Sequence, residues 1–194
     1  MKNETVTELK AAQRKLGIKS RVSLTPDERA LFSEIICEKL INHHVFKQSQ
    51  IILSYQAFMD EVDLSKFNIF AKSENKTVAY PTCQPGGIML AAVPASGEDI
   101  WKIDKYGIRS PLISRSHILA QEEIEFIVAP CVAFSGVSLS RMGWGAGYYD
   151  RFLPKCVNAF RVAAAFEAQK IDDLVCVPNW DVSLNAIVTE KAWY

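Results

Sequence analysis

Residues Arg141 to Phe152 combine glycine, basic, aromatic and acidic side chains at a spacing that suits phosphate chemistry. Three of the nine glycines of the chain stand at alternate positions in this segment, namely Gly143, Gly145 and Gly147. Glycine has no Cβ and reaches positive φ at little cost, so such a backbone can approach a ligand closely. The pattern turns helical after Gly147, and the free N–H groups of a helix starting there would form an anion site facing the loop.

Charged residues flank this glycine-rich loop. Arg141 carries a fixed positive charge that could pair with phosphate, and Asp150 carries a carboxylate that could hold Mg²⁺. The spacing Gly-x-Gly-x-Gly lacks the ending of a Walker A loop and differs from the Gly-x-Gly-x-x-Gly of dinucleotide-dependent oxidoreductases. Three glycines alone are explained more simply by a turn before a surface helix. The whole run Arg-x-Gly-x-Gly-x-Gly-Tyr-Tyr-Asp-Arg-Phe is far more specific than its glycines.

Basic side chains near the N-terminus form a second candidate group. Residues 1–21 carry six of them, Lys2, Lys10, Arg14, Lys15, Lys19 and Arg21. The usual explanation of such a run is a solvated helix face. The functional alternative is that Lys10 and Arg14, which are four residues apart and share a helix face, reach polyphosphate bound on the glycine-rich loop.

An acidic residue follows the first predicted strand, at 51–53. Glu61 stands shortly past the carboxyl end of this strand, where open α/β sheets collect groups that bind ligands. Glu61 is therefore a candidate polar contact, although an exposed loop acid is an equally good interpretation. Asp63 is expected to cap a helix that runs to about Lys72.

The first two helices are predicted from their start signals. Thr5 and Glu8 form a possible capping box for a helix over 5–19, with Gly17 as its stop signal. Thr25, followed by proline and two acidic residues, begins a core-facing helix that runs to about His43.

Strands alternate with these helices, which favours one domain (1–194) built on a mostly parallel sheet with helices on both faces. Gly86 and Gly87 suggest a turn that joins two strands into an antiparallel pair, and Pro81 ends the first of them. Residues 94–124 are poorly patterned. Strands are expected at 51–53, 77–80, 88–93, 125–129, 161–166 and 186–189.

Composition excludes several classes of protein. Lys plus Arg equals Asp plus Glu, at 22 each, so no bulk attraction to nucleic acid or to an anionic membrane is expected. No apolar run approaches the ~20 residues of a membrane span, and the polar N-terminus does not resemble a signal peptide. The five scattered cysteines indicate reduced, mostly core thiols in a cytoplasmic protein, and the three histidines show no zinc spacing.

The complete run from Arg141 resembles the signature of the 5-formyltetrahydrofolate cyclo-ligases, also called methenyltetrahydrofolate synthetases. Other stretches resemble the same family in the expected order, and together they span nearly the whole chain. They are Lys10-x-x-x-Arg14, Glu61-Val62-Asp63, Tyr106-Gly107-Ile108, Ala165-Phe166-Glu167-x-Gln169, Asp181-Val182 and Ile187-Val188-Thr189-Glu190. The resemblance implies the α/β fold of that family, a three-layer arrangement with an open, mixed and mostly parallel sheet.

The resemblance also implies a reaction. In this family 5-formyltetrahydrofolate and ATP give 5,10-methenyltetrahydrofolate, ADP and phosphate. The γ-phosphoryl group passes to the formyl oxygen, N10 of the folate attacks, and phosphate leaves. Because the second nucleophile is tethered, positioning supplies much of the rate, and no protein nucleophile is expected. The implied cofactors are ATP and Mg²⁺. The implied partner is the folate, free or polyglutamylated, bound by a cytoplasmic monomer.

Site residues follow from the resemblance position by position. Asp150 and Asp181 are expected to hold Mg²⁺, and Arg141, Tyr149 and Asp150 to take part in catalysis. Gln56 and Glu61 are expected to face the folate, together with residues 143–147. Neighbouring residues on a helix diverge, so one of Tyr148 and Tyr149 binds ligand while the other packs. The ATP-binding residues are expected to be Lys10, Arg14, Arg141, Met142, Gly143, Trp144, Gly145, Ala146, Gly147, Tyr148 and Tyr149.

Four positions depart from the pattern associated with the family, namely Ala146, Trp180, Asn185 and Ser110. The glycine-rich loop and Asp181 survive these changes, so ATP and Mg²⁺ binding are expected to persist, while the folate pocket, turnover or substrate preference could differ. A non-catalytic folate-binding or regulatory module on the same scaffold is the alternative to an enzyme. The phosphate- and metal-binding residues argue against it, because a pure binder needs neither.

Overall fold

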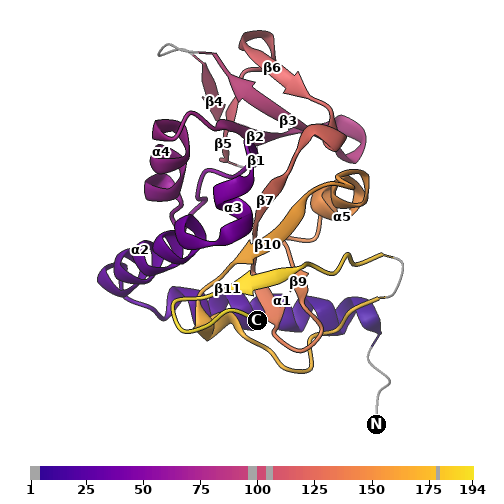
Figure 1. Cartoon of the computed structure of the whole chain (residues 1–194). Coiled ribbons are helices and arrows are strands. Elements are labelled where there is room, and N and C mark those ends of the chain that lie inside the picture. The colour runs from indigo at the N-terminus through magenta and orange to yellow at the C-terminus, as the bar shows by residue number, and fades with distance from the viewer. Residues whose placement is uncertain (1–4, 96–99, 104–106, 178–179) are drawn as a thin grey trace.

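The computed structural model describes residues 5–95, 100–103, 107–177 and 180–194. Its main sheet has seven strands and lies at the centre of the molecule (Figure 1). The strand order is β11-β10-β7-β1-β2-β3-β6, and neighbouring strands from β11 to β2 are parallel. β3 and β6 add an antiparallel edge, so the predicted mixed, mostly parallel sheet is confirmed. The strands are β1 (Ile51–Leu53), β2 (Thr77–Gln84), β3 (Ile88–Pro94), β6 (Ser116–Leu119), β7 (Phe126–Pro130), β10 (Phe160–Ala164) and β11 (Ala186–Val188).

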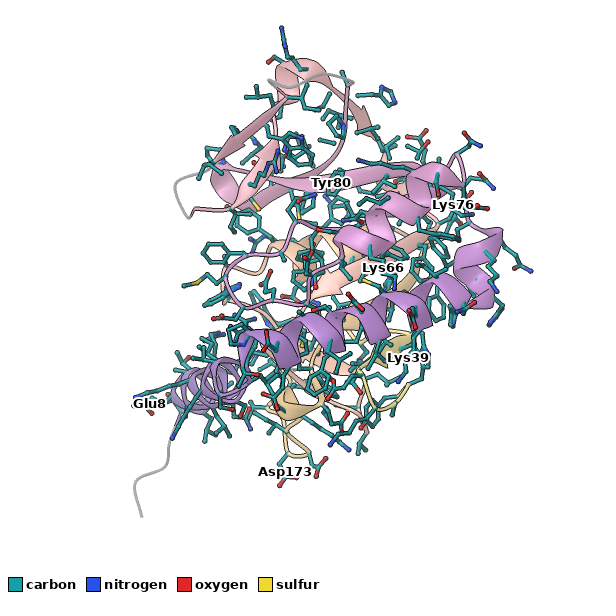
Figure 2. The ribbon with its side chains drawn as sticks, turned by 90° about the vertical axis from the view of Figure 1, so that its left-hand side faces the viewer. Glu8, Lys39, Lys66, Lys76, Tyr80 and Asp173 are labelled. Carbon is teal, nitrogen blue, oxygen red and sulfur yellow. The ribbon has the colours of Figure 1, made fainter. Side chains whose placement is uncertain are left out.

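Both faces of the sheet are buried. Helices α2 (Pro26–Asn42), α3 (His44–Gln48) and α4 (Ser65–Ser73) pack against one face, together with strand residues such as Ile52. Figure 2 shows this helix layer, where Lys39 of α2 and Lys66 of α4 are labelled. Leu53, the next residue after Ile52, belongs to a second core that contains α5 (Tyr148–Phe152) and the turn after it. Successive side chains of β1 thus point into the cores on opposite faces of the sheet, as expected for a central parallel strand.

Helix α1 (Val6–Val22) lies across the lower part of the molecule and runs past its predicted end at residue 19, so the interpretation of Gly17 as a stop signal is wrong. The helix continues past this residue to Val22. A Cβ at Gly17 would lie 2.4 Å from the carbonyl oxygen of Val132 and 2.9 Å from the Cβ of Ala133. Gly17 therefore lets the helix backbone dock closely on this segment, and its role is packing rather than termination.

Strand β2 also runs further than predicted. Pro81 was expected to end it, but the strand continues to Gln84, and Pro81 pairs with Ala91 of β3. The parallel partner β1 pairs only as far as Ala79, so Pro81 lies where β2 has a ladder on one side only. Such a position tolerates the missing N–H of proline. The predicted turn after β2 is confirmed, with Gly86 and the residue after it both at φ 75°.

Short strands account for most of the elements missed by the sequence pattern. β4 (Trp101–Ile103) and β5 (Arg109–Pro111) form a hairpin within the poorly patterned region. A second hairpin joins β8 (Ala133–Ser135) to β9 (Ser140–Met142) just before the glycine-rich loop. Arg141 therefore extends from a strand, not from the loop itself.

Helix starts follow the sequence signals closely. Both predicted capping boxes are present, at Thr5 and at Thr25. The prediction that Asp63 is the N-cap of α4 is wrong by one residue, because the N-cap is Leu64. Asp63 still contributes at this helix end, since its Oδ1 accepts from the Ser65 N–H at 2.9 Å. No described helix is long and apolar enough to cross a membrane. Tyr106, which belongs to one of the family-like stretches, and residues 178–179 lie outside the described residues.

Candidate active site

A cavity of about 1350 Å³ opens beyond the carboxyl ends of β1 and β7. The chain leaves β1 toward β2 on one side, and from β7 it continues to β10 on the other, so the cavity lies at the topological switch point of the sheet. The segments after these two strands contribute Gln56 and Cys131 to its wall. Every site residue expected from the sequence lines this cavity: Lys10, Arg14, Gln56, Glu61, Asp181 and all residues from Arg141 to Asp150.

The glycine-rich loop has the backbone geometry expected of it. Gly145 has φ 102°, and Gly147, the N-cap of α5, has φ 68°. A Cβ at Gly145 would lie 3.2 Å from a guanidinium nitrogen of Arg14, and one at Gly147 would lie 2.8 Å from a guanidinium nitrogen of Arg151. The helix that follows has only five residues, so the cations around the loop, rather than a helix dipole, supply most of its attraction for anions.

Three cations expected to bind phosphate surround this loop. Arg14 donates from Nε to the carbonyl oxygen of Gly143 at 2.9 Å. Arg141 has only 2% of its side chain exposed and donates to Asp150 Oδ1 at 3.3 Å. The ammonium group of Lys10 pairs with Asp181. Residues from the N-terminal helix thus meet residues more than one hundred positions further along the chain.

The two acids predicted to hold Mg²⁺ are therefore each paired with a cation predicted to hold phosphate. Asp181 also accepts a hydrogen bond from the Val177 N–H at 2.6 Å. Among the described residues, no group of three or more histidine, cysteine or acidic side chains could hold a metal ion. Mg²⁺ commonly takes one or two carboxylates, with water and phosphate oxygens as its other ligands. Asp150 and Asp181 thus suit an ion that arrives with a nucleotide.

The two tyrosines of the motif have different surroundings. Tyr148 donates from its hydroxyl to the Gln84 carbonyl oxygen at 3.3 Å. The ring of Tyr149 lies 5.1 Å from the guanidinium carbon of Arg141, and its buried hydroxyl has no hydrogen-bond partner among the described residues. Burial raises the pKa of Tyr149, which keeps the hydroxyl protonated and able to donate.

Glu61 joins the segment after β1 to the glycine-rich loop. Its Oε1 accepts from the Trp144 indole N–H at 3.1 Å, and its Oε2 accepts from the Phe58 N–H at 3.1 Å. The rings of Phe58 and Trp144 meet edge to face, with centroids 6.0 Å apart. Burial raises the pKa of Glu61, while these two hydrogen bonds and the charge of Arg21 oppose that rise. The alternative interpretation of Glu61 as an exposed loop acid is wrong.

Two arginines near the site were not singled out from the sequence. Arg151 lines the cavity and donates to the carbonyl oxygens of Gly87 and Ala146, which ties the β2–β3 turn to the loop. Arg21 was assigned to a solvated helix face, but it is 1% exposed and lies 5.5 Å from the Trp144 ring. Arg151 stands inside the motif and could have been found there, whereas nothing in the basic run distinguishes Arg21.

Three of the four departures from the family pattern line the cavity. Ala146, Trp180 and the buried Ser110 contribute to its wall. Asn185 instead lies at the start of β11, where its side chain accepts from the Arg161 N–H at 2.8 Å. Its substitution therefore concerns the sheet rather than the cavity.

Comparison with known proteins agrees with this geometry. The model of the 5-formyltetrahydrofolate cyclo-ligase family matches residues 6–190. The chain belongs to the 5-formyltetrahydrofolate cyclo-ligase family. Membership confirms the predicted family and makes the protein an enzyme of the ligase class.

Relatives of this cyclo-ligase family cover most of the chain. The 5-formyltetrahydrofolate cyclo-ligase of Haemophilus influenzae is 26% identical over 172 residues, which are 86% of this chain and 89% of that protein. The mouse enzyme is 26% identical over 180 residues, 88% of each chain. The solved structure of 5,10-methenyltetrahydrofolate synthetase from Aquifex aeolicus is 28% identical, with a TM-score of 0.80 over 95% of this chain and 91% of that one.

A second solved structure supports the fold alone. The 5,10-methenyltetrahydrofolate synthetase of Mycoplasma pneumoniae is 24% identical, with a TM-score of 0.73 over 93% of this chain and 98% of that one. The predicted cyclo-ligase fold is therefore confirmed by two structures as well as by the strand order.

Proposed function

We propose that this protein catalyses the ATP- and Mg²⁺-dependent cyclisation of 5-formyltetrahydrofolate to 5,10-methenyltetrahydrofolate, with release of ADP and phosphate. One observation carries the proposal: a single cavity combines the cations Lys10, Arg14 and Arg141 with a second region built from Glu61 and Trp144. Pockets for one small molecule typically measure about 300–1,000 Å³. A cavity of about 1350 Å³ has room for a nucleotide and a folate together.

The chemistry requires a donor and an acceptor in one enclosure. A formamide carbonyl is a poor electrophile, and its oxygen is a poor leaving group. Transfer of the terminal phosphoryl group of ATP to that oxygen makes it part of a phosphate leaving group. This phosphate departs when N10 of the folate attacks the formyl carbon. The proton of N10 is lost, and the ring closes with a carbon–nitrogen double bond. Because N10 is tethered to the formyl group, alignment supplies much of the rate.

The cations of the cavity would hold the phosphates and stabilise the charge that develops during transfer. Arg141 is suited to this role because it is buried, fixed between Asp150 and the Tyr149 ring, and adjacent to Gly143. Lys10 and Arg14 come from α1, where Arg14 contacts the loop at Gly143 and Lys10 contacts Asp181. When phosphate binds, it would compete with Asp150 and Asp181 for these cations and release their carboxylates.

Mg²⁺ would be held by Asp150 and Asp181, directly or through water, and would neutralise phosphate charge when bound.

Tyr149 would donate its hydroxyl to a ligand in the cavity, since that group otherwise lacks a partner among the described residues. Tyr148 would serve mainly in packing, because its hydroxyl already binds Gln84.

The folate would occupy the region of Gln56, Glu61 and Trp144. The amino-pterin ring carries N–H donors, and the Glu61 carboxylate is a buried acceptor at the cavity wall. The ring faces of Trp144 and Phe58 offer apolar surface beside it. The same proposal includes a single-domain monomer that acts in the cytoplasm on the free or polyglutamylated folate.

The test is an absorbance assay of the purified protein with 5-formyltetrahydrofolate and Mg-ATP. The expected result is growth of the near-ultraviolet absorbance of the methenyl product, dependent on both ATP and Mg²⁺. Folded protein that binds folate but gives no product would instead support the non-catalytic folate-binding alternative. The set of Lys10, Arg14, Arg141 and Asp150 argues against that alternative, because folate binding alone requires none of them.

A further inference from the structure

Arg21 is a charged side chain buried without an ionic partner. It is 1% exposed, and its Nε and one terminal guanidinium nitrogen are buried without a hydrogen-bond partner among the described residues. Within the same residues, no carboxylate forms an ion pair with it. Burying an unpaired charge is unfavourable, and an apolar side chain of similar size often serves packing as well or better. Packing alone therefore does not explain an arginine at this position.

The contacts of Arg21 lead to the folate region of the cavity. Its guanidinium carbon lies 5.5 Å from the centre of the Trp144 ring, within the range of a cation–π interaction. The indole N–H of Trp144 in turn donates to Glu61 at 3.1 Å. Trp144 and Glu61 line the cavity, whereas Arg21 lies behind them. Helix α1, the glycine-rich loop and the segment after β1 are thus connected through three side chains.

We infer that Arg21 is a positioning residue, which acts through the Trp144 ring and the Glu61 carboxylate to shape the folate end of the cavity. This inference rests on the proposed function. Arg21 orients the indole so that its N–H points at Glu61, and its positive charge favours the ionised form of that carboxylate. Both effects present a fixed acceptor to the N–H donors of a pterin ring.

The other titratable groups around Glu61 do not supply this charge. Tyr55 follows β1, Cys131 follows β7 and Tyr149 belongs to α5, and all three interact electrostatically with Glu61. Burial raises the pKa of Tyr55 and Tyr149, and it raises the pKa of Cys131 to about 12, so these groups are neutral near pH 7. Arg21 is the cation that opposes the effect of burial on the pKa of Glu61.

The test compares Arg21→Met, which keeps an unbranched side chain and removes its charge, with Arg21→Lys, which keeps the charge. Arg21→Met is expected to raise the KM for 5-formyltetrahydrofolate about tenfold and to leave the KM for ATP within about twofold, as loss of a desolvated cation–π contact would give. Arg21→Lys is expected to recover most of the folate affinity. Lys19→Met, an exposed cation on the same helix, is the matched control and should leave both constants unchanged.

The pH profile separates positioning from a general structural effect. Without the nearby positive charge, the Glu61 carboxylate is less stable and protonates at higher pH. The acid limb of kcat/KM for the folate should therefore move to higher pH in Arg21→Met and return in Arg21→Lys. Equal increases in both KM values with an unshifted profile would overturn the inference, and so would a variant that matches the wild type.

Trp144→Phe tests the same connection without changing α1. Trp144 is 43% exposed, so the fold should tolerate a ring that lacks the N–H donor. The folate KM should rise while the ATP KM stays close to that of the wild type. An unchanged folate KM would overturn the inference even if Arg21→Met did not fold. A wild-type protein without any turnover would instead contradict the proposed function, so the two failures are distinguishable.

Discussion

At the scale of single residues, opposite charges in the cavity are held in pairs. Arg141 contacts Asp150, and Lys10 contacts Asp181, so each acid holds a cation beside the glycine-rich loop. These pairs keep four charged groups within one cavity. On the proposed function, each of them would exchange its partner for phosphate or Mg²⁺. Such an exchange would let one set of side chains serve both an empty and a loaded site.

The first prediction concerns Asp150. Asp150→Asn keeps an oxygen that can accept from Arg141, so the thermal unfolding midpoint should stay close to that of the wild type. Loss of the carboxylate should lower the Mg²⁺-dependent initial rate about 100-fold, a loss expected when a metal site is disturbed. Asp172→Asn, at an exposed position, is the control and should keep the full rate. An Asp150→Asn protein with unchanged Mg²⁺ dependence would remove Asp150 from the metal site.

The second prediction concerns Glu61 and pH. Burial raises the folded-state pKa of Glu61 above its ordinary value of 4.5, so the native state favours the protonated form. The contribution of this group to stability is therefore greatest below the unfolded pKa and declines as pH rises through the folded one. The glutamine of Glu61→Gln does not titrate. The stability of this variant relative to the wild type should therefore increase as pH rises from below 4.5 to neutrality. Urea unfolding across this pH range measures the difference, and a flat difference would contradict the prediction.

Sequence alone identified the glycine-rich loop and several charged residues of the cavity but few of their contacts. Arg141 and Asp150 stand in one motif, so their common location follows from local spacing. The hydrogen bond from Trp144 to Glu61 joins residues 83 positions apart, and no pattern in the chain specifies it. Arg21 was misassigned for a related reason: a basic residue in a basic run is normally solvated, and its burial depends on what packs over the end of α1.

At the scale of elements, the position of α1 decides where two of the cations lie. The helix carries Lys10 and Arg14 and docks through Gly17 on the segment that leads into β8. The side chain of Gln13 fixes the same helix to the loop near β11, where it accepts from the Val175 N–H at 2.8 Å. The helix is thus positioned by backbone contact on one side and by hydrogen bonds on another.

The third prediction tests this docking. A methyl group at Gly17 would overlap the carbonyl oxygen of Val132, so Gly17→Ala must displace α1 or the chain beneath it. We expect a loss of about 1–3 kcal/mol in unfolding free energy, as is typical of overpacking, together with an increased KM for ATP. The folate KM should change less, because Glu61 and Gln56 come from another segment.

Ala11→Gly is the matched control for this variant. Ala11 is exposed on α1, and glycine there should lower stability by about 1 kcal/mol through helix propensity without moving the helix. Its KM for ATP should equal that of the wild type. If both variants raised this KM in proportion to their loss of stability, docking through Gly17 would have no specific role.

Element boundaries show why part of the fold could not be predicted. The capping boxes at Thr5 and Thr25 are local signals, and the structure confirms both. Gly17 and Pro81 are also strong local signals, but packing partners distant in sequence change their meaning. The hairpins β4–β5 and β8–β9 are built from strands of three residues each, which are too short to show an alternating pattern.

At the scale of the whole molecule, the order of the strands creates the site. The chain extends the sheet in one direction from β1 and in the other from β7, which leaves the cavity between the segments that follow these two strands. Helix α1 and the glycine-rich loop complete it from opposite ends of the sequence. Ligands should therefore bridge segments that come from distant parts of the sequence.

The fourth prediction follows from this bridging. A ligand that binds only the folded protein stabilises it by about 2.7 kcal/mol at 100 times its Kd. For a chain of this size, that corresponds to a rise of about 5–10 °C in the melting temperature. Mg²⁺ with a non-hydrolysable ATP analogue should produce this rise in the wild type, measured by differential scanning fluorimetry. Arg14→Ala should lose most of it at the same ligand concentration, and an equal rise in both proteins would exclude Arg14 from the nucleotide site.

The most direct test of the account is a crystal structure of the protein with Mg²⁺, a non-hydrolysable ATP analogue and 5-formyltetrahydrofolate. The account predicts that the γ-phosphate contacts Arg141 and the backbone of 143–149, with the formyl oxygen in line with it and the pterin ring at Glu61. Phosphates bound away from residues 141–150, or a folate outside this cavity, would contradict it.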